Sequence, residues 1–122
     1  MATRADFNVV PFNHNFDQPN ESAVKNFPIE AREIRDSHAY LLVQIQGVGP
    51  SSHGIKLNGK NITDSRTPDL PPAPNSSVAW FTWMLEFPAS MLKTGDNRIE
   101  IEKRGSDDFR VGNVVVHWRE IV

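Results

Sequence analysis

Residues 39–46 read Ala-Tyr-Leu-Leu-Val-Gln-Ile-Gln, and this alternation decides the fold class. Successive side chains of a β-strand point to opposite faces of its sheet, so every second residue shares a face. One face of this stretch is wholly apolar: Ala39, Leu41, Val43 and Ile45. The other face is mixed: Tyr40, Leu42, Gln44 and Gln46. The pattern predicts a half-buried antiparallel strand over residues 39–48, which Gly49 and Pro50 bring to an end.

Short apolar runs bounded by turn residues predict the other strands. These runs cover residues 6–12, 24–30, 78–87, 97–103 and 111–121. Residues 53–60 predict a tight hairpin, because Asn58-Gly59 supplies the positive φ angles of a type I′ turn. The longest predicted helix is a single turn over residues 89–92. Together these elements predict an all-β fold, an antiparallel β-sandwich.

Polar and proline-rich segments predict the loops of this sandwich. Residues 13–20 and 104–110 are polar, and the long segment 63–77 contains four prolines: Pro68, Pro71, Pro72 and Pro74. A loop of that length in a small domain is usually functional or mobile. Pro28 places the strand over residues 24–30 at a sheet edge, because proline cannot donate to a β-ladder.

Length and composition limit the classes of function. A chain of 122 residues is expected to form one β-sandwich domain over residues 1–122, in which residues 1–20 are a candidate N-terminal arm. The chain has no cysteine, which excludes disulfides and thiolate metal sites. Its 13 basic and 15 acidic residues give a net charge of -2, so neither nucleic acid nor a membrane is an expected partner. Residues 1–10 lack the apolar region of a signal peptide, which predicts a protein that is cytoplasmic or incorporated into a particle.

The middle and end of the chain carry a familiar arrangement of strands and turns. A strand at 39–43 is followed by the hairpin Ile55-Lys56-Leu57-Asn58-Gly59-Lys60, and residues 87–101 then read Phe-Pro-Ala-Ser-Met-Leu-Lys-Thr-Gly-Asp-Asn-Arg-Ile-Glu-Ile. Over residues 38–120 this layout resembles the jelly-roll modules of the galactose-binding-domain-like superfamily. The closing Val-Gly-Asn-Val-Val-Val-His-Trp of residues 111–118 is similar to an uncharacterised prokaryotic domain family of this fold. The resemblance implies a jelly roll, a scaffold that carries sugar-binding modules and also domains with structural roles.

No motif of the sequence predicts catalysis. Residues 54–60, Gly-Ile-Lys-Leu-Asn-Gly-Lys, match the spacing of a phosphate-binding loop, but Asn61 stands where the magnesium-binding hydroxyl should follow. The serines beside His53 lie in a turn without the strand and helix of a nucleophile elbow. Glu100 and Glu102 share one face of one strand and do not form the facing pair that glycoside hydrolysis needs. We therefore expect a protein that is not an enzyme and has no catalytic residue and no cofactor.

Metal binding has little support in the sequence. The histidines show no pair at the spacing of metal ligands. Asp107 and Asp108, before the last strand, are the weak exception, because adjacent carboxylates and loop carbonyls can bind calcium. A solvated acidic loop is the favoured interpretation of this pair.

The first functional hypothesis is a non-catalytic structural or assembly subunit, such as a shell-decoration, tail or filament component of a virion or other particle. Its partner would be another copy of the chain or another structural protein, reached through the N-terminal arm by strand addition at an open sheet edge. In the strand over residues 78–87, alternation leaves Trp80 on the face opposite the predicted core. The proposed interface residues are Phe7, Val9, Val10, Phe12 and Trp80.

The alternative hypothesis is a carbohydrate-binding module or small lectin, with carbohydrate as the partner. It rests on the superfamily resemblance and on the flat ring of Trp80, since an exposed aromatic plate can stack on a sugar. The predicted ligand-binding residues are Trp80, Asn75, Asp107 and Arg110.

Overall fold

A computed structural model describes residues 2–49, 53–62, 70 and 79–122 of the chain. Its first elements are β1 (Thr3–Phe16), β2 (Ser22–Ile29), β3 (Glu33–Ile34), β4 (His38–Gln46), β5 (His53–Leu57) and β6 (Lys60–Asn61). They are followed by β7 (Trp80–Pro88), the 3₁₀ turn η1 (Ala89–Met91), β8 (Gly95–Lys103) and β9 (Phe109–Ile121). The predicted loop over residues 63–77 lies outside the described residues, apart from the buried Leu70.

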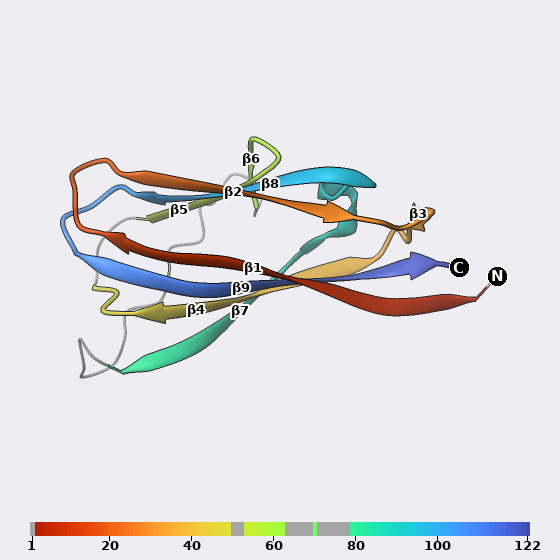
Figure 1. The fold of residues 1–122 in the computed structure, drawn as a ribbon, viewed down its shortest axis with the longest axis horizontal. Helices are drawn as coiled ribbons and strands as arrows, with labels where there is room; N and C mark the ends of the chain where they lie inside the picture. The colour runs from red at the N-terminus through yellow and green to blue at the C-terminus, as the bar shows by residue number, and fades with distance from the viewer. Residues whose placement is uncertain (1, 50–52, 63–69, 71–78) are drawn as a thin grey trace.

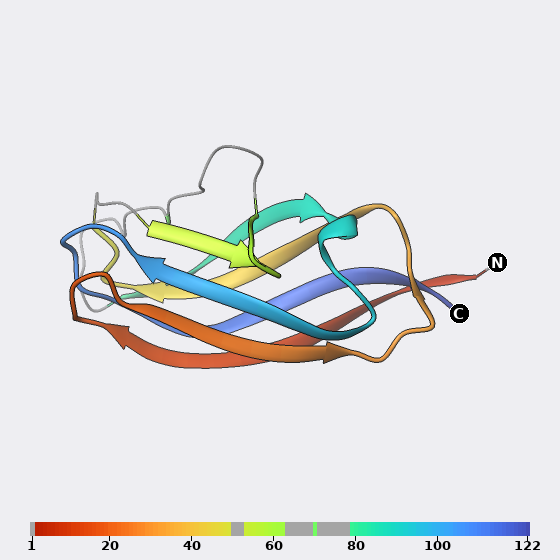
Figure 2. The same cartoon turned by 90° about the horizontal axis from the view of Figure 1, so that it is seen from above.

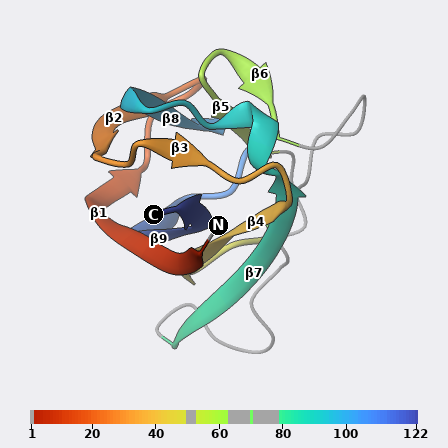
Figure 3. The same cartoon turned by 90° about the vertical axis from the view of Figure 1, so that its right-hand side faces the viewer.

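The strands form two antiparallel sheets packed face to face (Figure 1). The larger sheet has the strand order β1-β9-β4-β7, and β3 pairs with the last residues of β9. The smaller sheet has the order β2-β8-β5-β6. The view from above shows the strands of both sheets running along the same long axis (Figure 2), and the end-on view shows the two layers with β7 at the margin of the larger one (Figure 3). The predicted antiparallel β-sandwich is confirmed.

The core lies between the sheets and follows the predicted alternation. The four residues of the predicted apolar face of β4 are completely buried: Ala39, Leu41, Val43 and Ile45. In the smaller sheet, Ile55 pairs with Ile101 and Leu57 pairs with Ile99, and all four side chains are buried. Each large apolar side chain that becomes fully buried contributes about 1.5–3 kcal/mol to folding.

Strand β9 contains a bulge that changes which of its side chains face the core. Val43 pairs with Val114 while Ile45 pairs with Val111, so two residues of β9 stand opposite the single Gln44. The inward positions therefore shift from odd to even numbers along the strand, from Phe109 and Val111 to Val114, Val116 and Trp118. Gly112 is one of these two residues, and a Cβ atom at its position would lie 2.5 Å from Gln44 Oε1.

Strand β1 is longer than the sequence predicts. The expected strand was 6–12 and the expected loop 13–20, but β1 pairs with β9 from Thr3 to Phe16. A register shift between Pro11 and His14 accommodates Asn13, whose φ of 45° lies in the left-handed region that asparagine tolerates. Beyond this bulge, the ring of Phe16 stacks on Phe109 at 4.6 Å.

The N-terminal segment is thus an integral strand of the sandwich, which corrects two of the proposed interface residues. Val10 and Phe12 are buried in the core and present no surface to a partner. A buried carboxylate also ties β1 to β9: Arg4 donates to Glu120 Oε2 from Nε and Nη2, at 3.1 and 2.9 Å, and Trp118 Nε1 donates to Glu120 Oε1 at 2.9 Å. Pairing with β9 and the contacts of Glu120 therefore hold the N-terminal strand β1 in place.

The Asn-Gly hairpin has the predicted turn, because Asn58 and Gly59 have φ angles of 52° and 83°. The side chain of Asn58 also connects two distant segments. Its Nδ2 donates to Met91 O at 2.9 Å, and its Oδ1 accepts from the backbone N–H of Arg98 at 2.8 Å.

Strand β2 pairs only with β8 among the described strands, which agrees with the edge position predicted from Pro28.

Asn97 completes this connection, which we call the asparagine latch (Asn58 and Asn97). Asn58 Nδ2 donates to Asn97 Oδ1 at 3.0 Å, and the backbone N–H of Lys93 donates to the same oxygen at 3.0 Å. Asn97 Nδ2 donates to the carbonyls of Lys93 and Gly95 at 2.8 and 3.2 Å. Because Asn97 is buried and its amide is fully hydrogen-bonded, the latch explains why asparagine suits both position 58 and position 97.

We expect the substitution Asn97→Ala to lower the free energy of unfolding by about 2–4 kcal/mol, because it removes a buried amide and leaves Asn58 Nδ2 and the backbone groups of Lys93 and Gly95 without these hydrogen bonds. Urea unfolding followed by tryptophan fluorescence measures this change. The matched control is Asn26→Ala, at an exposed position of β2, which should change stability by less than about 0.5 kcal/mol. Equal stability of the two variants would contradict the role given to the latch.

Candidate binding face on the larger sheet

The outer face of the larger sheet, which points away from the smaller sheet, carries a row of aromatic rings. Phe7 pairs with His117, and His117 pairs with Tyr40 on its other side. The rings of Tyr40 and His117 stack at 4.5 Å with an angle of 13°, and Phe7 lies 5.6 Å from His117. Phe7 is tilted by 30° against His117, and three strands thus contribute one group of ring contacts, which we call the aromatic stack (Phe7, His117 and Tyr40). Burial lowers the pKa of His117 below its usual 6.5, which favours the neutral ring at pH 7.

The next row along the strands is apolar. Val9 pairs with Val115, Val115 with Leu42, and Leu42 with Met84. Met84 and Phe7 are among the most exposed large apolar side chains, at 59% and 58%. Isolated apolar side chains on a surface are common, but a contiguous group across four strands indicates a binding surface.

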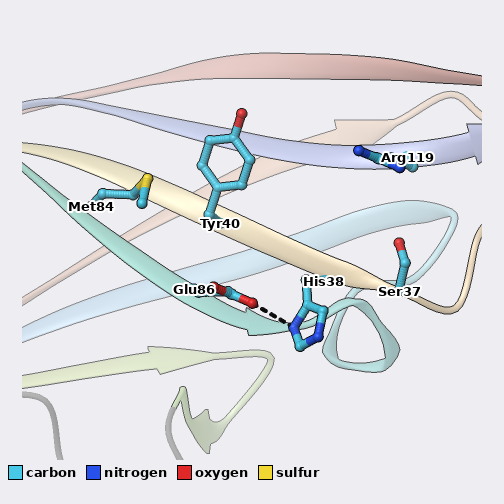
Figure 4. A pocket seen from close by; sticks show the side chains of 6 residues that line it. All are labelled: Ser37, His38, Tyr40, Met84, Glu86 and Arg119. Carbon is cyan, nitrogen blue, oxygen red and sulfur yellow. Dashed lines mark ion pairs between the residues drawn. The ribbon is translucent and has the colours of Figure 1, made fainter.

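A hollow of about 410 Å³ lies beside the aromatic stack, and we call it the first hollow (Figure 4). Its lining combines an aromatic ring, a thioether and polar groups: Ser37, His38, Tyr40, Met84, Glu86 and Arg119. His38 Nδ1 and Glu86 Oε1 form an ion pair at 2.7 Å on its β7 side. Apolar walls with a few hydrogen-bonding groups are typical of small-molecule sites.

A second hollow of about 230 Å³ follows along the same strands. It is lined by Leu42, Gln44, Thr82, Asn113 and Val115. The β9 bulge shapes this hollow, because Gln44 Oε1 accepts a hydrogen bond from the backbone N–H of Asn113 at 3.2 Å.

Two of the predicted ligand-binding residues meet at the far end of this face. Gln46 pairs with both Trp80 and Arg110, and the guanidinium carbon of Arg110 lies 5.6 Å from the centre of the Trp80 ring. Arg110 Nη1 also donates to Gln46 Oε1 at 3.4 Å. Alternation placed Trp80 on the face opposite the core but left its exposure open, and in the structure its side chain is 43% exposed. The structure therefore brings Trp80 and Arg110 together on the outer face.

Asp107, the third predicted ligand-binding residue, braces two loops. Its Oδ2 accepts from the backbone N–H of Gly49 at 2.8 Å and lies 2.8 Å from Nε2 of the buried His53. Burial raises the pKa of Asp107, but the hydrogen bonds from His53 and Gly49 outweigh this effect and hold the pKa below its usual 3.8. Asp107 Oδ2 therefore already has its partners within the fold. The fourth predicted residue, Asn75, lies outside the described residues.

The weak calcium hypothesis involved Asp107 together with Asp108. Asp108 Oδ1 lies 2.6 Å from Nζ of the buried Lys103 and so neutralises that lysine. Within the part of the chain that the structure describes, no three histidine or acidic side chains are grouped as metal ligands. Each of the two aspartates thus has one carboxylate oxygen in contact with a partner within the chain.

Sequence reasoning missed the aromatic stack and the first hollow. The alternation of residues 39–46 did place Tyr40 and Leu42 on the mixed face. This was the part of the site that a single segment of the sequence could indicate. Phe7 and Val9 were predicted as exposed interface residues, and they do lie on the outer face. His117 and Arg119 join the face only through the register of β9 with its two neighbours.

The fold resembles carbohydrate-binding modules of known structure. A family 35 carbohydrate-binding module from an environmental isolate superposes with a TM-score of 0.61 at 18% identity, over 82% of this chain and 67% of that one. The family 35 module from Clostridium thermocellum gives 0.59 at 13% identity, over 95% and 98%. A β-porphyranase of glycoside hydrolase family 86 from Bacteroides plebeius gives 0.51 at 20% identity, over 93% of this chain but only 20% of the enzyme. These likenesses establish a jelly-roll β-sandwich of the kind found in carbohydrate-binding modules.

The sequence itself identifies the family. A model for a family of unknown function (DUF7383) matches residues 4–120, and the chain belongs to this family. No curated protein matches the sequence. Within the described residues, no helix is long and apolar enough to cross a membrane.

The Asp107 brace predicts a pH-dependent stability. Because the pKa of Asp107 is lowered on folding, the ionised carboxylate stabilises the fold above pH 3.8, and this contribution is lost as the pH falls through the lower folded-state value. We expect Asp107→Asn to cost about 1–3 kcal/mol at pH 7, with the difference from wild type shrinking below pH 3.8.

Urea unfolding at pH 7, 5, 3.5 and 2.5 measures this difference. The exposed Asp36 supplies the control, because Asp36→Asn removes the same charge without touching the brace. A cost for Asp107→Asn that stays constant over this range would show that the charge of Asp107 is not involved.

Proposed function

We propose that the chain is a non-catalytic carbohydrate-binding module whose ligand lies on the outer face of the larger sheet. The observation that carries the proposal is the aromatic stack of Phe7, His117 and Tyr40 beside the first hollow. A sugar ring has an apolar C–H face and a rim of hydroxyl groups. It therefore needs a flat apolar plate with hydrogen-bonding groups at its edge, and this is the combination that the first hollow offers.

The polar groups around Tyr40 suit hydroxyl recognition. Glu86 and His38 form an exposed ion pair that can accept and donate hydrogen bonds, and Arg119 supplies a planar set of donors on the opposite side. The likeness to family 35 carbohydrate-binding modules supports the proposal at the level of the fold. The solved β-porphyranase shows that a similar sandwich occurs as part of a larger glycoside hydrolase.

The substitution Tyr40→Ala tests the proposal. The wild-type chain should bind one or more members of a broad glycan panel, and Tyr40→Ala should weaken that binding about tenfold or more, because it removes the stacking plate. Tyr40→Phe should retain most of the affinity, since it keeps the ring and loses only the hydroxyl group.

Isothermal titration calorimetry with each glycan that binds provides the measurement. Val24→Ala is the matched control, because Val24 is an exposed apolar residue of β2 in the other sheet. Unfolding midpoints of all variants confirm that the fold is kept. A panel without any binding, with and without calcium, would refute the proposal.

The assembly hypothesis remains a second proposal, and the exposed apolar row favours it. Phe7, Val9 and Met84 lie on one face with Val115 and Leu42 between them, and β1 and β7 form the two edges of that sheet. A second copy of the chain or another structural protein could cover this face. Deleting residues 1–20 would not test this proposal, because Val10, Phe12 and Phe16 belong to the core.

Light scattering over a range of concentrations separates the two proposals. Self-assembly through the outer face predicts a discrete multimer that Val9→Asp converts to monomer, because a charge would be buried at the contact. A monomer at every concentration would exclude self-assembly and leave the face open to a glycan.

A further inference from the structure

The two hollows of the outer face lie in line along the strands. Both are lined by β4, β7 and β9, and β1 contributes to neither. The first hollow contains Tyr40 and Glu86, which are paired, and the second contains Gln44 and Thr82, which are also paired. A ligand that fills both hollows must therefore run along β4 and β7 rather than across the sheet.

Trp80 provides an aromatic plate at the end of this line. It pairs with Gln46 and projects from β7 on the same face as Thr82 and Met84. An ideal Cβ atom on Gly112 would lie 3.3 Å from Trp80 Cζ3, so the ring lies close against the backbone of β9. Together with the guanidinium of Arg110, this contact holds the ring in a defined orientation.

The separation of the two plates sets the length of the ligand. Tyr40 and Gln46, the partner of Trp80, are both on β4, and the rise per residue of a strand places them about 20 Å apart. This distance exceeds the length of a disaccharide. The surface between them carries one apolar row, Leu42 with Met84, and then one hydrogen-bonding row, Gln44 with Thr82.

From this arrangement we infer that the ligand is an extended, unbranched oligosaccharide chain, bound along β4 and β7 from Tyr40 to Trp80. The inference rests on the proposed carbohydrate-binding function and adds that the site recognises the interior of a polysaccharide rather than a single terminal sugar.

The test uses ladders of cello-, xylo-, manno-, chito- and neoagaro-oligosaccharides, from disaccharide to octasaccharide, titrated into the full chain by calorimetry. Affinity should rise with chain length by about tenfold or more between the disaccharide and the hexasaccharide and then level off. With the hexasaccharide, Tyr40→Ala and Trp80→Ala should each weaken binding about tenfold. With the disaccharide, only one of the two substitutions should have an effect, because a short ligand reaches one plate.

The remaining outcomes separate this inference from the proposed function. Val24→Ala, on the other sheet, should leave every affinity unchanged. An affinity that is already maximal for the disaccharide would overturn the inference and keep carbohydrate binding. Binding of branched or terminal glycans from the broad panel without binding of any ladder would do the same. If no ladder and no panel glycan bound, both the proposed function and the inference would fail.

Discussion

The rows of side chains that link β1 to β4 across the larger sheet pass through β9, which pairs with β1 on one side and with β4 on the other. Its inward residues Val114, Val116 and Trp118 help to fill the core, so the strand cannot slip by one residue without exposing them. The position of His117 between Phe7 and Tyr40 follows from this double pairing. The bulge at Gly112 then shifts the pairing of β9 with β4 by one residue. As a result, the side chain of Gln44 lies over the backbone of β9.

Buried polar groups hold together segments that are distant in the sequence. The asparagine latch joins the β5–β6 hairpin to the start of β8, and Asp107 joins the segment around Gly49 to His53. Glu120 forms an ion pair with Arg4 of β1. Since an unsatisfied polar group in the core is costly, each of these contacts favours one arrangement of the loops over others.

The candidate site lies on strands, and this has consequences for binding. Side chains on a hydrogen-bonded sheet lose less conformational entropy on binding than side chains on a loop, so less of the interaction energy is spent on ordering. The aromatic stack is ordered further by its own ring contacts. A flat, preorganised face is well suited to a long ligand that makes many weak contacts, whether that ligand is a glycan or, in the second proposal, a neighbouring subunit.

The sequence by itself determined the features that depend on neighbouring residues. Alternation over residues 39–46 predicted the core face of β4 and the outward position of Tyr40, and Asn58-Gly59 predicted the hairpin turn. The place of Trp80 outside the core was also readable from alternation. Alternation over residues 7–12 separates Phe7 and Val9 from Val10 and Phe12, but only the tertiary structure decided that Val10 and Phe12 face the core and that Phe7 and His117 flank the same surface as Tyr40. The reason is that these relations depend on strand pairing and on the bulges of β1 and β9, where one extra residue changes the register and leaves no signal in the local alternation.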